Sequence, residues 1–203
     1  IGFCLVGSEM CIRDSPCCAS THKCLDAVLD LRREHGFTAD QVDSVHTVVG
    51  SSNKRNLSYD DPQNDREAKF SMQYCLALGL VQDHLRIADF APEAVSRPEL
   101  RALIPRITMD AFPVERERAG ETPPDHEVTV RLKDGTVFET TRAHPRGTIH
   151  DPFDAADRAA KYADCIAGKL DDNDSAALAD VLTRFEAVND LDEVMRFLRF
   201  DLG

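Results

Sequence analysis

The 203-residue sequence has little of what marks several common protein classes. No apolar run approaches the roughly 20 residues that a membrane-spanning helix requires, so we expect no membrane insertion. Lys and Arg number 24 against 36 Asp and Glu, which gives a formal net charge of −12. Because no Lys- or Arg-rich run interrupts this acidic balance, nucleic acid is not an expected partner. The hydrophobic content of 42% is too high for a disordered chain and indicates a folded core.

Sequence signatures of common catalytic classes are also missing. There is no GxGxxG or GxxxxGK[ST] phosphate loop, no GxSxG nucleophile motif and no HExxH zinc motif. Seven cysteines are present without a CxxC pair, and the spacing of Cys18, Cys24 and Cys75 matches no iron–sulfur pattern. The strong signals for zinc and for a redox pair are therefore absent. Free thiols fit a reducing compartment, and we expect a cytoplasmic protein.

Residues 1–15, IGFCLVGSEMCIRDS, differ from the rest of the chain. They show neither a helical stripe nor sustained alternation, lack an initiator Met and do not open with the basic region of a signal peptide. The stretch resembles the translation of a sequencing adapter. We interpret it as a non-native leader, fused to a chain whose true N-terminal part is missing. A short edge strand at residues 3–6 is the alternative.

The first half of the chain predicts a mixture of helices and strands. Ser20 is a good N-cap, and the apolar stripe after it ends at Gly36, a helix C-terminal signal. Residues 41–50 are rich in β-branched side chains and predict a strand. A polar loop follows, and residues 66–80 then predict one helix.

The second half contains a clear β-hairpin. Apolar residues alternate up to Asp134 and Gly135, the favoured pair of a type I′ turn, and residues 136–141 return. Residues 106–111 predict another strand, and from residue 154 the chain predicts helices only. An antiparallel hairpin with separate helices indicates the α+β class rather than a doubly wound fold.

The order of four stretches resembles the C-terminal half of the MmgE/PrpD family. They are SPCCASTHKCLDAVLDLRREHGF, DREAKFSMQYCLALGLV, the hairpin and PRGTIHDPFDAADRAAKYADCI. The family includes 2-methylcitrate dehydratase, cis-aconitate decarboxylase and an iminodisuccinate epimerase. The resemblance implies that residues 16–150 form the smaller α+β domain of the family. It also implies that residues 151–203 form helices that return to an all-helical domain, which is missing from this chain.

The same resemblance implies a homodimeric lyase that needs neither a metal nor an organic cofactor. Its expected reaction is the dehydration of a small di- or tricarboxylate such as 2-methylcitrate, as in propionate metabolism, after removal of a proton α to a carboxylate. Decarboxylation and epimerisation are alternatives from related carbanion chemistry, and a non-catalytic α+β assembly module is another. Because half of the active-site cleft would be missing, we expect the 203-residue chain to be inactive by itself.

The stretch SPCCASTHKCLDAV places His22 in the first turn of a predicted helix, where the resemblance implies the edge of a substrate pocket. The positive end of a helix favours the neutral, proton-accepting imidazole and suits a substrate carboxylate. We therefore predict that His22 is the catalytic base. The alternative is that His22 only caps or packs the helix start. Cys17 and Cys18 are interpreted as packing residues, because the family chemistry uses no thiol nucleophile.

Two cations of the DREAKFS stretch are the predicted substrate-binding residues. Lys69 is expected to hold a substrate carboxylate across the cleft. The alternative is a solvated helix Lys, or one that pairs with Asp65 four residues earlier. Arg66 resembles an Arg of the methylcitrate-dehydratase branch and is the second expected binding residue.

Overall fold

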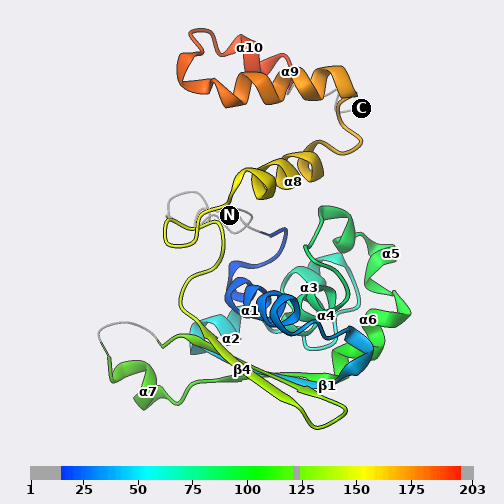
Figure 1. Ribbon diagram of the computed structural model, residues 1–203, viewed down its shortest axis with the longest axis vertical. Coiled ribbons are helices and arrows are strands. Elements are labelled where there is room, and N and C mark those ends of the chain that lie inside the picture. Colours follow the sequence, from blue (N-terminus) through cyan, green and yellow to red (C-terminus); the bar gives the residue numbers. More distant parts are fainter. Residues whose placement is uncertain (1–14, 121–123, 198–203) are drawn as a thin grey trace. The chain divides into compact units, whose positions relative to one another are not determined.

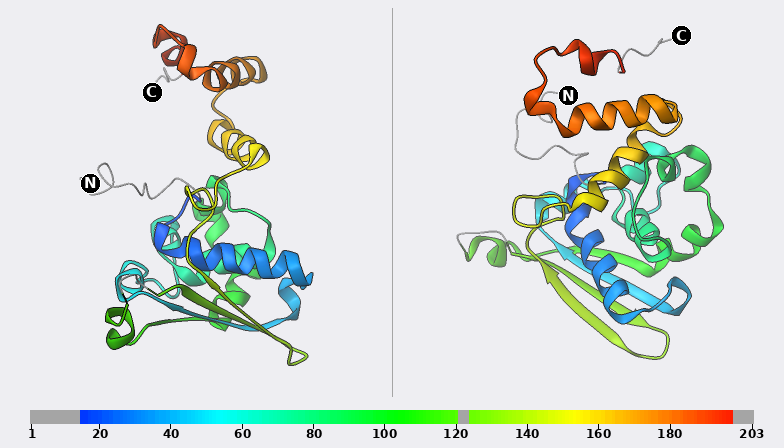
Figure 2. Two further views of the ribbon diagram at one scale, coloured as in Figure 1. Left: turned by 60° about the vertical axis from the view of Figure 1, so that its left-hand side comes forward. Right: turned by 45° about the horizontal axis from the view of Figure 1, so that its top comes forward.

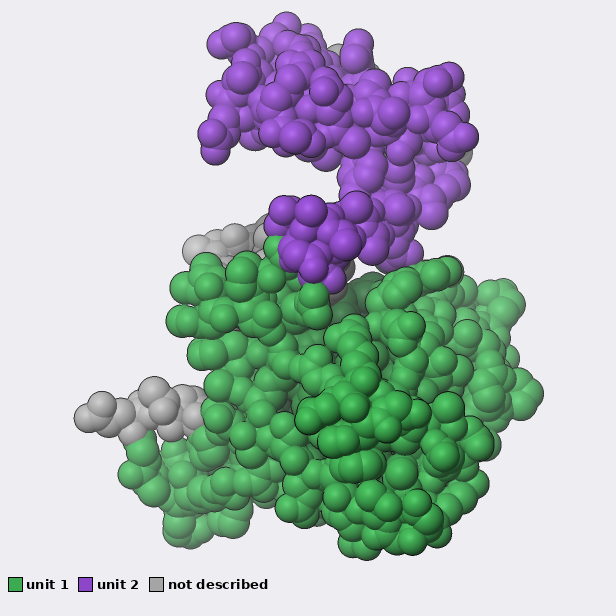
Figure 3. Space-filling model, viewed as in Figure 1, with its two compact units in different colours: residues 1–153 green, residues 154–203 purple. Residues whose placement is uncertain are grey.

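The computed structural model describes residues 15–120 and 124–197. The chain divides into two compact units, residues 1–153 and 154–203, which Figure 3 shows in different colours. The predicted leader, apart from its last residue, and the alternative strand at residues 3–6 lie outside the described residues. The non-native origin of this segment therefore stays a prediction, as does the assignment of the two sequence-based domains.

In the first unit, helices are mixed with the strands of one sheet (Figure 1), which confirms the predicted α+β class. Short 3-10 turns occur at Ala39–Gln41, Ile87–Phe90 and Ile104–Arg106. The helices and strands are, in chain order, α1 (Ala19–His35), β1 (Val42–Val49), α2 (Ser51–Asn56), α3 (Asp65–Lys69), α4 (Met72–Val81), α5 (Pro92–Val95), α6 (Pro98–Leu103), β2 (Ile107–Ala111), α7 (Val114–Arg118), β3 (His126–Leu132) and β4 (Val137–Arg142).

The four-stranded sheet has the order β2-β1-β3-β4. Strand β2 runs parallel to β1, whereas the β1–β3 and β3–β4 pairs are antiparallel. The sheet is therefore mixed rather than purely antiparallel, because the long helical connection from β1 returns the chain to the same end of the sheet. Alternate residues of β3 are buried, so one face of the sheet carries the core. Figures 1 and 2 show α1 and α4 side by side over that face.

Helix α4 lies at the centre of the core, and all its residues from Met72 to Leu80 are buried. It packs against α1 at Gly79, where an added Cβ would lie only 2.8 Å from Cδ1 of Leu25. Arg32, near the end of α1, donates hydrogen bonds to the carbonyl oxygens of Gly79 (2.6 Å) and Gln82 (2.8 Å). These contacts fix the distance and the rotation of α1 relative to α4.

The helix predicted over residues 66–80 is in fact two helices. Helix α3 ends at Lys69, and Ser71 is the N-cap of α4, where its hydroxyl accepts a hydrogen bond from the Tyr74 N–H (3.1 Å). Helix α2 was predicted as part of a polar loop. Glu117 holds its start by accepting hydrogen bonds from the backbone N–H and the hydroxyl of Ser51.

The turn between β3 and β4 differs from the predicted type I′ turn. The Gly135 N–H donates to the carbonyl of Leu132 (3.0 Å), and Gly135 has a φ of +91°. A type I′ turn needs positive φ at both central residues, but no residue other than glycine has positive φ in the described part of the chain. The loop is a three-residue turn with Gly135 in the left-handed position, and Asp134 accepts a hydrogen bond from the Thr136 N–H (2.9 Å).

The second unit is helical, as the sequence predicts for this region. It contains α8 (Ala155–Ile166), α9 (Asp172–Thr183), a 3-10 turn at Phe185–Ala187 and α10 (Asp192–Met195). Carboxylates cap α8 and α9, and a small core holds the unit together through Leu178, Val181, Val194 and Phe197. Among the described helices, none is both long and apolar enough to cross a membrane.

Gly79→Ala tests the contact between α1 and α4. The new methyl group would overpack against Leu25, at a typical cost of about 1–3 kcal/mol, which the better helix propensity of Ala offsets by about 1 kcal/mol. We expect a net loss of about 0–2 kcal/mol in the free energy of unfolding, measured by urea denaturation. In a Leu25→Ala background the same change should cost less, because the methyl group then has room. A stabilising effect of Gly79→Ala in the wild-type background would contradict this packing.

Candidate active site

The start of α1 is built by the backbone that precedes it. The Cys18 N–H donates to the carbonyl of Lys69 (2.9 Å), and the Cys18 carbonyl accepts from the N–H (2.9 Å) and the hydroxyl (2.8 Å) of Thr21. Cys18 is therefore the N-cap residue, and the prediction of Ser20 was wrong. Ser20 lies within the helix and is buried, where its hydroxyl accepts a hydrogen bond from Asn56 (3.1 Å). The SPCCASTHKC and DREAKFS stretches, both part of the family resemblance, thus meet at this point.

His22 lies in the first part of α1, as predicted, and it is only 2% exposed. Its Nε2 atom lies 3.3 Å from the carbonyl oxygen of Cys17. A carbonyl oxygen can only accept a hydrogen bond, so Nε2 carries the proton in the neutral ring. The lone pair, which is the part of the imidazole that accepts a proton, is then on Nδ1. The assignment of His22 as a catalytic base stays a prediction.

The buried thiol of Cys17 lies beside this histidine, and a second buried thiol, that of Cys75, lies beside Cys17. The Sγ atom of Cys17 is 3.1 Å from the hydroxyl of Thr21 and also interacts with Cys75. A hydrogen bond from Cys75, together with the neighbouring His22 and Thr21, lowers the pKa of Cys17 although the thiol is buried. Burial raises the pKa of Cys75. The thiol beside His22 is therefore itself hydrogen-bonded, to Thr21 and Cys75.

Asp26 lies one helical turn after His22, and residues four apart share a face of a helix. Its side chain is 14% exposed, and burial raises its pKa to about 6. The backbone N–H of Arg146 (2.7 Å) and the charges of Arg142 and His22 oppose this rise. The sequence prediction did not include Asp26, although its spacing from His22 was a readable signal. Above pH 6, its carboxylate is placed to stabilise an imidazolium ion on this face of α1.

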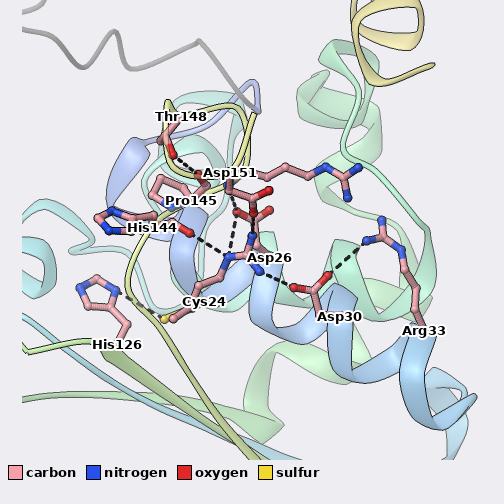
Figure 4. Close-up of polar contacts among 11 residues, drawn as sticks. Cys24, Asp26, Asp30, Arg33, His126, His144, Pro145, Thr148 and Asp151 are labelled. Carbon is pink, nitrogen blue, oxygen red and sulfur yellow. Dashed lines mark hydrogen bonds and ion pairs between the residues drawn. The ribbon is translucent and has the colours of Figure 1, made fainter. Parts of the chain in front are cut away.

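Arg142, at the end of β4, holds the loop after the hairpin against α1. Its guanidinium pairs with Asp26 (3.6 Å), Asp30 and Asp151, and it donates to the carbonyl of His144 (3.0 Å). Figure 4 shows Asp26 and Asp30 on α1 beside the loop that carries His144 and Asp151. The hairpin, the loop and α1 are thus joined through one side chain that is only 17% exposed.

The predicted substrate-binding residues lie on α3. The Lys69 ammonium pairs with Asp65 at 3.7 Å and is 43% exposed, which is the arrangement that the alternative interpretation described. Arg66 is exposed, and it forms no hydrogen bond or ion pair with the described residues. No described contact joins either cation to the His22 ring, although the Lys69 backbone adjoins the start of α1. Within the described ranges, no three His, Cys, Asp or Glu side chains gather so that they could hold a metal ion.

A comparison with protein-family models places these residues in a known family. Residues 15–186 match the model of the MmgE/PrpD C-terminal domain. The chain belongs to the MmgE/PrpD family. His22, Asp26 and Arg142 all lie inside the matched region.

One curated relative in the family is cis-aconitate decarboxylase from Mus musculus. It is 22% identical to this chain over 202 residues, which cover 94% of the chain and 40% of the relative. The chain thus spans about 40% of the length of this relative. The MmgE/PrpD family is an enzyme family of dehydratases and decarboxylases.

Asp26→Asn tests the electrostatics of the site. Because the pKa of Asp26 is raised from 3.8 to about 6, its carboxyl contributes stability at low pH that is lost as the pH rises to about 6. Relative to the variant, the wild type should therefore lose stability between about pH 4 and pH 6, by at most about 3 kcal/mol, and then stay level.

The measurement is the free energy of unfolding of both proteins across this pH range. Taking the difference removes the contributions of other groups, such as His126, whose pKa burial lowers to about 4. Asp43→Asn is the matched control, because Asp43 is exposed and makes no ion pair with the described residues. If the wild type instead gained stability relative to Asp26→Asn as the pH rose, the pKa of Asp26 would be lowered in the folded protein. The charge of Arg142 would then outweigh the effect of burial on this pKa.

Proposed function

We propose that this chain forms the C-terminal part of a cofactor-independent lyase that acts on a small di- or tricarboxylate, with His22 as the base. The observation that carries the proposal is the placement of His22 and Asp26 four residues apart on one face of α1, where their charges interact, inside the region that matches the family. The site combines a proton acceptor, a carboxylate that stabilises its protonated form and a backbone carbonyl that orients the ring.

The proposed reaction begins at the carbon atom α to a substrate carboxylate. Nδ1 of His22 takes the α proton while Nε2–H donates to the carbonyl of Cys17. The charge of the Asp26 carboxylate then stabilises the imidazolium ion through space. The electron pair left on carbon forms the double bond as the C–O bond on the neighbouring carbon breaks. The departing hydroxyl group becomes water by taking up one proton, which the imidazolium form of His22 returns. This sequence is the dehydration of a 2-methylcitrate-type substrate.

Decarboxylation is the second candidate reaction, and the similarity to mouse cis-aconitate decarboxylase favours it. In that case a carbon–carbon bond breaks, CO₂ leaves and the resulting carbanion takes up a proton, which protonated His22 would supply. In both reactions Lys69 and Arg66 are proposed to attract substrate carboxylates. A cytoplasmic location and a homodimer are also part of the proposal. A non-catalytic assembly module would instead use the same fold without turnover.

His22→Gln in a protein that joins this chain to the remaining, helical part of the family architecture tests the proposal. If His22 removes the α proton, kcat should fall by roughly 10²–10⁴-fold, with a smaller effect on KM. The exchange of solvent deuterium into recovered substrate should fall in parallel, because it reports the same proton transfer. Turnover is measured with 2-methylcitrate, by formation of the alkene, and with cis-aconitate, by release of CO₂.

Two matched variants complete this experiment. His84→Gln removes an exposed histidine from a loop and should leave kcat and KM unchanged. Lys69→Met should chiefly raise KM if Lys69 grips a carboxylate equally in the ground and transition states. The burial of His22 also suits a packing role, and a kcat within a few-fold of wild type in His22→Gln would establish that role. A folded full-length protein without turnover on either substrate would favour the assembly module.

A further inference from the structure

A cavity of about 700 Å³ lies in the first unit between β2, α6 and the loop before α3. This volume is within the range of about 300–1,000 Å³ that is typical of small-molecule sites. None of the residues that line the cavity belongs to the candidate active site. Its apolar lining consists of Ile104, Pro105, Ile107 and Met109, and its polar lining consists of Lys54, Asp60, Asp61, Gln73, Arg101, Thr108 and Asp110.

The charges in this cavity do not balance. Lys54 pairs with Asp110 at 3.1 Å, and Arg101 pairs with Asp61. Each of the two cations is therefore neutralised by its own carboxylate. Asp60 has no cationic partner among the described residues, and its carboxylate accepts a hydrogen bond only from the Gln73 amide (3.0 Å). The cavity thus carries one uncompensated negative charge.

Gln73 provides a second, independent feature. The residue is 4% exposed, and its amide donates from Nε2 to Asp60, which fixes the orientation of the amide because a carboxylate can only accept. Its Oε1 atom is then a buried acceptor without a hydrogen-bond partner in the described part of the chain. Buried acceptors are almost always paired in folded proteins, so this oxygen requires a donor. Because Oε1 has almost no accessible surface, the amide must rotate before this oxygen can accept a hydrogen bond from a ligand in the cavity. The Asp60 carboxylate and the rotated amide oxygen would together favour a cation that donates several hydrogen bonds.

We propose that this cavity binds a small primary ammonium ion with a short hydrocarbon chain. The ammonium group donates hydrogen bonds to Asp60 and, after a small rotation of the amide, to Gln73 Oε1, while the hydrocarbon chain contacts the apolar lining. An anionic ligand is disfavoured because it would lie beside the unpaired Asp60. An uncharged alcohol lacks the positive charge that Asp60 attracts. The proposal is independent of the lyase activity.

The test uses n-pentylammonium as the probe and the complete 203-residue chain at low ionic strength. Ligand-observed NMR titration should show saturable binding with a Kd on the order of 1 mM, as suits a ligand with few heavy atoms. Pentanol and pentanoate have the same hydrocarbon chain without the positive charge, and each should bind at least tenfold more weakly. Added salt should weaken the binding of the ammonium ion more than that of pentanol.

Variants locate the binding site. Asp60→Asn should weaken n-pentylammonium binding at least tenfold, and Gln73→Met should also weaken it. Asp43→Asn removes the same charge from an exposed position on β1 outside the cavity and should leave the Kd unchanged. If Gln73→Met fails to fold, the exposed Asp60→Asn still decides the outcome. Equal binding of pentanol, absence of saturation at tenfold the expected Kd, or an unchanged Kd in Asp60→Asn would each overturn the proposal.

Discussion

The pairing of Arg142 with three carboxylates is the interaction on which the candidate active site depends. A guanidinium that is largely removed from water must be paired, because an uncompensated buried charge is costly. Here the partners come from α1 and from the loop after the hairpin, so the charge can be satisfied only when both lie beside the end of β4. The same contacts surround Asp26, which shares a helix face with His22. The ion pairs of Arg142 therefore also help to fix the helix face that carries the proposed base.

Hydrogen bonds at both ends of α1 hold this helix in place. Its start is tied to α3 through the hydrogen bond between Cys18 and Lys69, and its end is tied to α4 through Arg32. Between these points, Gly79 lets the two helices approach closely. Segments that are about 50 residues apart in the chain thus determine the position of α1, the helix that carries His22. The short PCCASTH motif therefore takes up its geometry only when α1 is packed against α3 and α4.

Local signals in the sequence were sufficient to predict the α+β class and most of the helices and strands. The glycine after α1 and the hairpin pattern predict elements that are present, because helix ends and tight turns depend on neighbouring residues. Ser71 was also a readable N-cap signal, which could have separated α3 from α4. Helix α2 is different, since it depends on Glu117, which follows 66 residues later in the chain. The parallel pairing of β2 with β1 is equally non-local.

The residues of the candidate active site also divide into those that local sequence signals indicate and those that depend on distant parts of the chain. His22 could be selected because a histidine in the first part of a helix has a distinctive electrostatic environment and because its motif resembles that of a family. Asp26 could have been selected from the helix repeat. The role of Arg142 was not readable, because it requires knowledge that the end of the hairpin lies beside α1. Lys69 is a counterexample, since its most visible tertiary contact is made by its backbone carbonyl rather than its charge.

The fold orients His22 so that its proton-accepting nitrogen in the neutral ring is Nδ1. Long-range ¹⁵N–¹H NMR correlation of the histidine rings at a pH where His22 is neutral tests this claim directly. We expect the Nε2–H tautomer, because Nε2 faces the carbonyl oxygen of Cys17. Detection of the Nδ1–H tautomer would contradict it, since the lone pair of Nε2 would then face that oxygen and Nδ1 could not accept a proton.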